Sequence, residues 1–130
     1  MTFKCPACAV NTLIITRSID LPPDAHNDEL TLQIVQCGSC HFHGAAVYEE
    51  SRRGPLDSES WHHHGYQLSD ADWEALVAAI NRCPAPRNEG CACATHVSLC
   101  KVDDRHNWDG LRQNGIELKN DFKMQYVPEP

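Results

Sequence analysis

The chain has 130 residues and a formal net charge of −7, because 18 Asp and Glu outnumber 11 Lys and Arg. The length suits one compact domain, and an acidic chain with no basic patch larger than Arg52-Arg53 argues against a nucleic-acid partner. No apolar run approaches the roughly 18 residues needed to span a bilayer, so we expect no membrane partner either.

Three strands are predicted in the N-terminal part of the chain. Residues 12–20 are rich in β-branched and apolar side chains, and residues 30–36 alternate apolar and polar positions, with turn-forming residues between the two segments. A third strand is predicted over residues 45–50, directly after Gly44. We therefore expect a small antiparallel β unit over residues 1–50, with a long polar loop joining its first two strands.

Helices and a further strand are predicted in the C-terminal part. A helix is expected over residues 69–82, because Ser69 is a good N-cap and an apolar stripe follows it at helical spacing. The stripe consists of Trp73, Leu76, Val77 and Ile80. A short helix is expected over residues 105–113. An alternating strand is expected through Phe122, Met124 and Tyr126.

Two Cys-x2-Cys pairs flank the predicted hairpin. They are Cys5 with Cys8 and Cys37 with Cys40. Each pair can place two thiolates on one tight turn, and two such turns supply the four soft ligands that tetrahedral Zn²⁺ prefers. A thioredoxin-type redox pair would need a βαβ context, which the predicted elements lack. We expect a structural zinc here, while iron in a rubredoxin-like site uses the same ligands and stays open.

The two pairs belong to a wider pattern, which runs Cys5-Pro6-Ala7-Cys8, a hairpin, then Cys37-Gly38-Ser39-Cys40 followed by His41-Phe42-His43-Gly44. In this pattern residues 5 to about 50 resemble the zinc-ribbon family. The resemblance implies the four cysteines as metal ligands and implies no catalytic residue. Ala9 follows the first pair, where many ribbon knuckles have glycine. Ribbons serve in transcription, translation, enzyme subunits and protein docking, so the resemblance implies a metal site without a specific function.

Four further cysteines lie close together in the C-terminal half. They are Cys83, Cys91, Cys93 and Cys100. Cys-x-Cys segments recur in clustered zinc modules, and this spacing does not match the ferredoxin-type runs that hold iron–sulfur clusters. We therefore expect a second structural zinc on these thiolates. His96 lies inside the cluster and His106 lies just beyond it, so either could replace one cysteine.

Two other interpretations of the second cluster stay open. Three ligands, such as Cys83, Cys91 and Cys93, would leave a coordination position for water, with Glu89 as the nearby carboxylate base. The same thiols could instead form a disulfide or a thiol switch. The first twenty residues contain no apolar signal core, so we expect reduced thiols and a cytoplasmic location.

Residues 51–68 show no periodicity, and an irregular connection of this length usually serves a function. Its Arg52 and Arg53 could grip an anion, while His62 or His64 could transfer a proton near neutral pH. These four residues are the candidate catalytic groups. Three adjacent histidines cannot all face one site on an extended chain, so we favour a non-catalytic role and keep binding of a partner or ligand open.

We predict an α+β fold in which the ribbon at residues 1–50 packs with one amphipathic helix and a Cys-rich, metal-stapled segment. Residues 51–130 hold the loop, the helix over residues 69–82 and the second cluster, and they form one compact domain with the ribbon. The predicted function is a two-zinc accessory or interaction protein that docks on a protein partner. The alternative is a small metal-dependent enzyme that uses the second cluster or the Arg/His loop on an anionic substrate, and we favour the non-enzymatic function.

Overall fold

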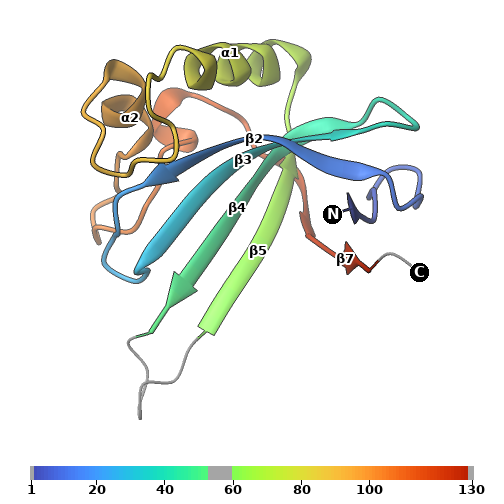
Figure 1. Cartoon of the computed structure of the whole chain (residues 1–130), viewed down its shortest axis with the longest axis horizontal. Coiled ribbons are helices and arrows are strands. Elements are labelled where there is room, and N and C mark those ends of the chain that lie inside the picture. The colour runs from blue at the N-terminus through green and yellow to red at the C-terminus, as the bar shows by residue number, and fades with distance from the viewer. Residues whose placement is uncertain (1, 53–59, 129–130) are drawn as a thin grey trace.

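A single antiparallel sheet dominates the computed structural model, which describes residues 2–52 and 60–128 (Figure 1). Within these residues the sheet has seven strands, in the spatial order β6-β5-β4-β3-β2-β1-β7. The strands are β1 (Thr2–Phe3), β2 (Leu13–Leu21), β3 (Glu29–Cys37), β4 (His43–Ser51), β5 (Ser60–Gln67), β6 (Lys119–Lys123) and β7 (Tyr126–Val127). Every neighbouring pair is antiparallel, so the chain builds the sheet largely from hairpins.

The three strands predicted in the N-terminal part are confirmed. β2 begins and ends one residue later than its predicted segment, and β3 and β4 extend theirs by one or two residues at each end. β2 pairs with β3 from Leu13↔Cys37 to Leu21↔Leu30, with a register shift between Ile15 and Arg17. The alternating apolar pattern therefore sets a register that carries both cysteine pairs to one end of the sheet.

The prediction of an irregular loop over residues 51–68 is wrong for its second half. Residues 60–67 form β5, which pairs with β4 along its whole length, as in Tyr48↔His63. No apolar alternation marks this strand, because polar and aromatic side chains occupy both of its faces and most of them are exposed or half-buried. Residues 53–59 of the predicted loop lie outside the described residues.

The predicted α+β arrangement, a small ribbon packed with one amphipathic helix and a Cys-rich, metal-stapled segment, is also wrong. β2, β3 and β4 are the middle of a larger sheet, to which the C-terminal half adds β5 and β6 on one side and β7 on the other. The apolar pattern does not indicate this, because β6 and β7 are short and mostly exposed. Both halves of the chain thus contribute strands to one sheet.

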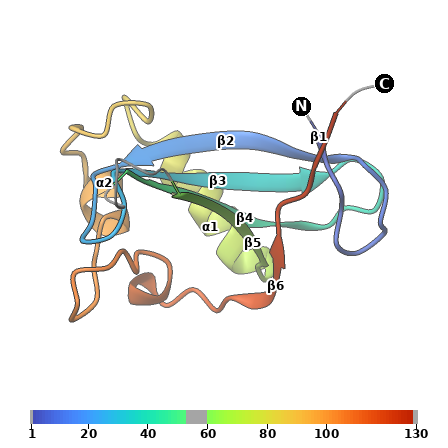
Figure 2. The same cartoon turned by 90° about the horizontal axis from the view of Figure 1, so that it is seen from below.

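The amphipathic helix expected over residues 69–82 is present, and it lies against one face of the large sheet (Figure 2). α1 (Asp70–Asn81) begins after Ser69, whose hydroxyl accepts a 3.2 Å hydrogen bond from the Asp72 N–H. Its Leu76 and Ile80 are buried against strand residues. The His43 ring of β4 stacks on Trp73 with ring centroids 4.7 Å apart, which fixes the helix to the strand.

The other C-terminal predictions hold only in part. The short helix expected over residues 105–113 is a 3₁₀ turn, η2 (Arg112–Asn114), which ends at Gly115 with a φ of 76°. A helix that was not predicted, α2 (Ala94–Leu99), follows the Cys-rich stretch. The strand expected through residues 122–126 is divided between β6 and β7. In the described residues, no helix combines the length and the apolar character that crossing a membrane requires.

The two faces of the sheet differ in what covers them. The face under α1 carries the larger core cluster, with strand residues Ile19, Leu21, Leu30, Leu32, Ile34, Ala45 and Val47. The opposite face is covered at one end by Phe3 and Met124, which pack with Val35 beside the first cysteine pairs. The other end of that face presents polar side chains. The polar end of this face is therefore not covered by the core clusters, and it lies beside the second Cys-rich stretch.

Gly44 provides a test of the β4–β5 pairing. A Cβ atom at this position would collide with the carbonyl oxygen of Tyr66, which belongs to the sheet backbone and cannot move independently. Gly44→Ala is expected to lower the free energy of unfolding by about 3 kcal/mol, measured by denaturant titration. Gly38→Ala is the control, because its Cβ would lie 4.0 Å from the nearest atom, the Thr12 oxygen. Equal losses in the two variants would contradict the pairing.

Candidate metal centres

The four N-terminal cysteines meet at one end of β2 and β3. Cys5 and Cys8 lie in the turn before β2, Cys37 is the last residue of β3, and Cys40 lies in the turn before β4. Their four sulfurs all lie within 4.8 Å of one another. The sulfurs of Cys5 and Cys40 are 3.5 Å apart, and those of Cys8 and Cys37 are 3.8 Å apart.

These distances match a metal-binding tetrahedron. At a zinc–sulfur distance of about 2.3 Å, the sulfurs of a regular tetrahedron lie about 3.8 Å from one another. A disulfide would place two sulfurs about 2.05 Å apart. All eight cysteines lie in the described ranges, and none of them forms a disulfide. The first group is therefore arranged to hold a metal ion.

Each cysteine pair uses the same backbone turn. Ala9, after Cys8, has a φ of 62°, and His41, after Cys40, has a φ of 65°. The left-handed conformation lets the chain fold back, so that the Ala9 N–H donates to the Cys5 carbonyl at 2.9 Å. Alanine therefore adopts the turn where many ribbon knuckles have glycine, although a Cβ atom in this region costs about 1 kcal/mol.

The thiols of the first group cannot all ionise independently. Burial raises the pKa of Cys37, but hydrogen bonds from the Thr12 hydroxyl at 3.1 Å and the Ser39 N–H at 3.3 Å outweigh it and lower the pKa to about 6. The Phe42 N–H lowers the pKa of Cys40, but burial and the neighbouring thiols raise it to about 12. A bound cation would stabilise the four thiolates together.

The second group gathers around the C-terminal end of α1. Cys83 lies just after the helix, Cys91 and Cys93 lie in the following loop, and His96 lies in the first turn of α2. Their ligand atoms all lie within 4.8 Å of one another. The Cys83 sulfur is 3.9 Å from that of Cys91 and 3.1 Å from His96 Nδ1, and the Cys93 sulfur is 3.5 Å from the same nitrogen.

His96 is oriented for metal binding by the strand beneath it. Its Nε2 lies 3.0 Å from the carbonyl oxygen of Asp20, which can only accept, so this nitrogen carries the proton. The lone pair of Nδ1 is then directed at the thiols of Cys83 and Cys93. A hydrogen bond from the distal ring nitrogen to a carbonyl is the usual support for a ligating histidine.

Helix α2 also lowers the pKa of one thiol of the second group. Cys93 is the N-cap of α2, and its sulfur accepts a 3.4 Å hydrogen bond from the His96 N–H. This hydrogen bond is the main reason that the pKa of Cys93 falls to about 6. Burial raises the pKa of Cys83 to about 11. The second group therefore repeats the electrostatics of the first, with one thiol prepared as a thiolate beside another that resists ionisation.

Cys100 and His106 lie outside the second group. The Cys100 thiol donates to the carbonyl of Val97 at 3.4 Å, at the other end of α2. His106 is exposed, in a turn where its N–H donates to the Asp103 carbonyl. The place that the sequence interpretation gave to Cys100 is occupied by His96, one helical turn earlier. The Cys93-x2-His96 spacing on the first turn of a helix is the signal that favours this choice.

The loop between Cys83 and Cys91 is fixed to the end of β2. The Asp20 N–H donates to the Pro86 carbonyl at 2.7 Å, and the Arg87 Nε lies 3.1 Å from the Asp20 carboxylate. Asp20 therefore contacts His96 through its carbonyl, and it contacts the loop through its N–H and its carboxylate. The two centres lie at opposite ends of β2 (Figure 1).

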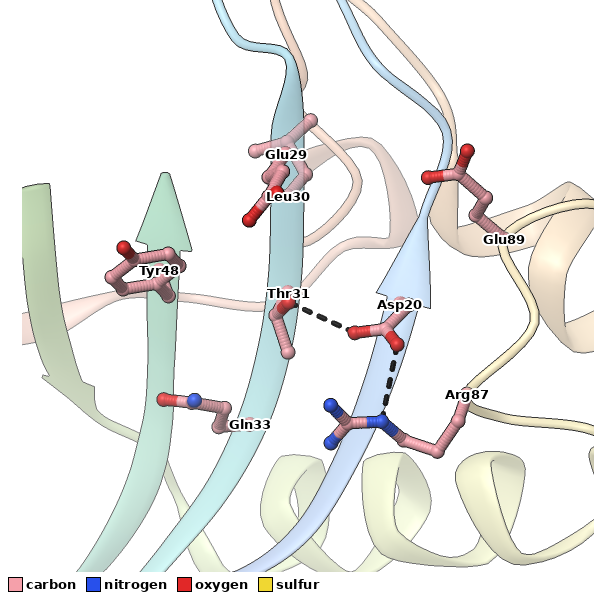
Figure 3. Close-up of a pocket in the computed structure, with 8 residues that line it drawn as sticks. All are labelled: Asp20, Glu29, Leu30, Thr31, Gln33, Tyr48, Arg87 and Glu89. Atoms are coloured by element: carbon pink, nitrogen blue, oxygen red, sulfur yellow. Dashed lines mark hydrogen bonds and ion pairs between the residues drawn. The ribbon is translucent and has the colours of Figure 1, made fainter. Parts of the chain in front are cut away.

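A polar cleft of about 490 Å³ lies between this loop and the face of the sheet away from α1 (Figure 3). Asp20, Thr31, Gln33 and Tyr48 come from three neighbouring strands, and the metal-binding loop supplies Arg87 and Glu89. Glu29 and Leu30 complete the lining. The Asp20 carboxylate accepts from the Thr31 hydroxyl at 2.9 Å and pairs with Arg87, so the centre of the cleft is already hydrogen-bonded.

The candidate catalytic residues that the structure describes do not all lie together. His62 and His64 lie on the face of β5 that continues the α1 side of the sheet, while His63 lies on the other face and its Nε2 is 2.6 Å from Gln33 Oε1. Arg52 is bonded to the buried Glu50 at 3.2 Å. Arg53 lies outside the described residues.

Comparisons with protein-family models, with curated proteins and with solved structures found no match to this chain. The zinc-ribbon resemblance therefore stays a prediction. The geometry supports a coarser statement: two groups of cysteine and histidine side chains, within the described ranges, are arranged to bind two metal ions.

Single-residue variants distinguish the two possible fourth ligands of the second group. His96→Ala is expected to remove one metal ion per chain, because it takes away one of four ligand atoms and the contact with Asp20. Cys100→Ser is expected to leave the metal content unchanged. Elemental analysis of both purified variants measures this. A loss of metal in Cys100→Ser with none in His96→Ala would contradict the assignment.

The left-handed conformation of Ala9 in the first turn leads to a second prediction. Ala9→Gly is expected to stabilise the metal-loaded protein by about 1 kcal/mol, because glycine adopts the left-handed φ of 62° without the Cβ penalty. Ala7→Gly, in the same turn, is the control and is expected to be neutral or destabilising. Chemical denaturation with metal present measures both. Destabilisation by Ala9→Gly would show that the turn differs from the one described.

Proposed function

We propose that both groups bind zinc and that both sites are structural. Each group offers four ligand atoms, which are four sulfurs in the first group and three sulfurs with one imidazole nitrogen in the second. Closed sets of this kind, with soft sulfur donors, are typical of structural zinc. The first group would then serve as the knuckles of a ribbon-like unit. Iron could occupy the all-cysteine group with the same geometry, so metal analysis is part of the test.

We further propose that the protein is an interaction module, and that the cleft beside the second centre binds a basic, extended segment of a protein partner. The observation that carries this proposal is the charge of the cleft lining. Asp20, Glu29 and Glu89 contribute three carboxylates against the single guanidinium of Arg87. Arg87 is paired with Asp20, and Arg52 beside the cleft lies 3.7 Å from Glu29 and 3.2 Å from the buried Glu50. With Glu50 and Arg52 included, four carboxylates stand against two guanidinium groups, so an excess of negative charge remains.

Exposed groups beside the cleft extend the same surface. The Tyr48 ring stacks on Trp61 with centroids 6.4 Å apart, and 59% of the Trp61 surface is exposed. Aromatic rings beside carboxylates bind the aliphatic and cationic parts of Lys and Arg side chains. The net charge of −7 would attract such a segment from a distance, and salt would weaken the attraction.

An enzymatic function has less support. Catalysis at the second centre needs an open coordination position, and His96 supplies a fourth ligand atom there. Along β5, His62 and His64 lie on the face opposite to His63, and Arg52 is paired with Glu50 of β4. These two features count against the enzymatic alternative and favour binding.

The charge of the cleft can be tested with a defined peptide. The probe is a fluorescent peptide of alternating Lys and Thr residues, and fluorescence anisotropy measures its Kd for the zinc-loaded protein. The double variant Glu29→Gln/Glu89→Gln is expected to weaken binding about tenfold, because it removes two carboxylates without changing side-chain shape.

The matched control removes the same charge elsewhere. Glu74 and Glu117 are exposed, in α1 and in the segment that bonds to it, away from the cleft. Glu74→Gln/Glu117→Gln is expected to change the Kd by less than about twofold. Equal weakening in the two double variants would mean that only net charge matters, and the proposed cleft would be wrong.

A further inference from the structure

Two histidines and a glutamate share one face at the far end of the sheet. His62 and His64 are two residues apart on β5, so both point to the same side of the strand. Glu49 of β4 lies directly opposite His62, and Val47 lies opposite His64. The three polar side chains are therefore neighbours across one strand pair, on the side of the sheet that α1 covers further along.

The two imidazoles are close neighbours whose ligand atoms do not yet converge with that of Glu49, because among the described residues only the two cysteine-rich groups gather their ligand atoms within 4.8 Å. The two ring centroids are 5.7 Å apart, with 17° between the ring planes. Two imidazoles bound tetrahedrally to one zinc ion, at about 2.1 Å from nitrogen to metal, have centroids about 5 Å apart. Both histidines are exposed, so their rings can rotate to turn one nitrogen each toward the same point.

The carboxylate of Glu49 is half-buried, and few groups around it compensate its negative charge. Burial raises its pKa, the nearby Asp24 carboxylate raises it further, and His64 and His62 act in the opposite direction. The Asn27 amide donates to it in a long contact of 3.4 Å. Among the described residues, no Lys or Arg forms an ion pair with Glu49. A bound cation would compensate this half-buried charge.

A polar cavity of about 390 Å³ opens beside His62 and Glu49. Its other lining residues are Asp24, His26, Asn27, Ser51, Ser60, Asn107 and Trp108. The Oδ1 atom of Asn107 is buried and has no hydrogen-bond partner among the described residues. The wall around Asp24 is rigid, because that carboxylate accepts from the N–H groups of Asn27 and Trp108, each at 2.7 Å. The cavity is therefore a preformed space for water or a small polar ligand.

We propose that His62, His64 and Glu49 form a third metal site, which binds an exchangeable first-row divalent cation such as Zn²⁺, Co²⁺ or Ni²⁺. Two imidazoles and one carboxylate suit these ions better than Mg²⁺ or Ca²⁺. Three protein ligands leave coordination positions open, and two of the three, His62 and Glu49, line the cavity. The site lies on the opposite side of the sheet from the cleft, and it does not depend on the proposed peptide binding.

The test uses protein whose two cysteine-rich groups are already loaded with zinc. Co²⁺ is added, and the visible absorption of Co²⁺ in a site of low coordination number reports binding. The expected result is one further equivalent of Co²⁺ without a thiolate charge-transfer band. A thiolate charge-transfer band would show that Co²⁺ replaces zinc at the cysteines. If Co²⁺ binds only in this way, with no further saturable binding, the proposal is wrong.

Matched histidine variants locate the site. His62→Gln, His64→Gln and Glu49→Gln are each expected to weaken Co²⁺ binding at least tenfold. His63→Gln is the control from the middle of the same run, because His63 lies on the other face beside Gln33. Its Kd is expected to stay within about twofold of the parent protein. If His63→Gln weakens binding as much as its neighbours do, the ion is chelated by a His-rich segment and the proposed site is wrong.

A fold control keeps the test decisive. The denaturation midpoint of each variant is measured in the zinc-loaded state, and Glu49→Gln is the most conservative of the four changes. Weakened Co²⁺ binding in Glu49→Gln at an unchanged midpoint supports the site. Unchanged binding in that variant removes the carboxylate from the site and overturns the proposal.

Discussion

Strand β2 is tied at both ends to a cysteine-rich centre, and the arrangement of the other elements depends on this constraint. Its first residue, Leu13, pairs with Cys37 of the first group, and the carbonyl of Asp20 accepts from His96 of the second. The seven residue steps between them span about 23 Å at the rise of a strand. A structural zinc contributes about 10–16 kcal/mol in small domains, as much as the whole free energy of unfolding of a typical domain, about 5–15 kcal/mol. Metal content and fold stability are then expected to be inseparable.

The two ends of the sheet differ because the two centres are built differently. The first centre lies between short turns, and Phe3 of β1 and Met124 pack on the face beside it. The second is built on a longer loop between Cys83 and Cys91, and that loop stands beside the sheet as a wall of the cleft. Glu49, His62 and His64 lie on β4 and β5, which pair along the whole length of β5 without a residue of either centre.

Local sequence patterns predicted the structure correctly wherever a single physical requirement determines the local conformation. Cys-x2-Cys pairs, the alternation in β2 and β3, and Ser69 before an apolar stripe each predicted a feature that the structure contains. β5 was not predicted because it carries polar and aromatic side chains on both faces, so its partners and not its own pattern make it a strand. The fourth position of the second group depends on which side of α2 faces Cys83, and a tertiary contact, His96 with Asp20, decides it.

The most direct test of this account titrates the zinc-loaded protein with a thiol-specific mercurial while a dye follows released zinc. The chain has eight cysteines, of which seven belong to the two groups. We expect one thiol, Cys100, to react without releasing zinc, and the other seven to release two zinc ions per chain. Release of fewer than two zinc ions, or reaction of several thiols before any zinc appears, would contradict a sheet held at both ends by metal.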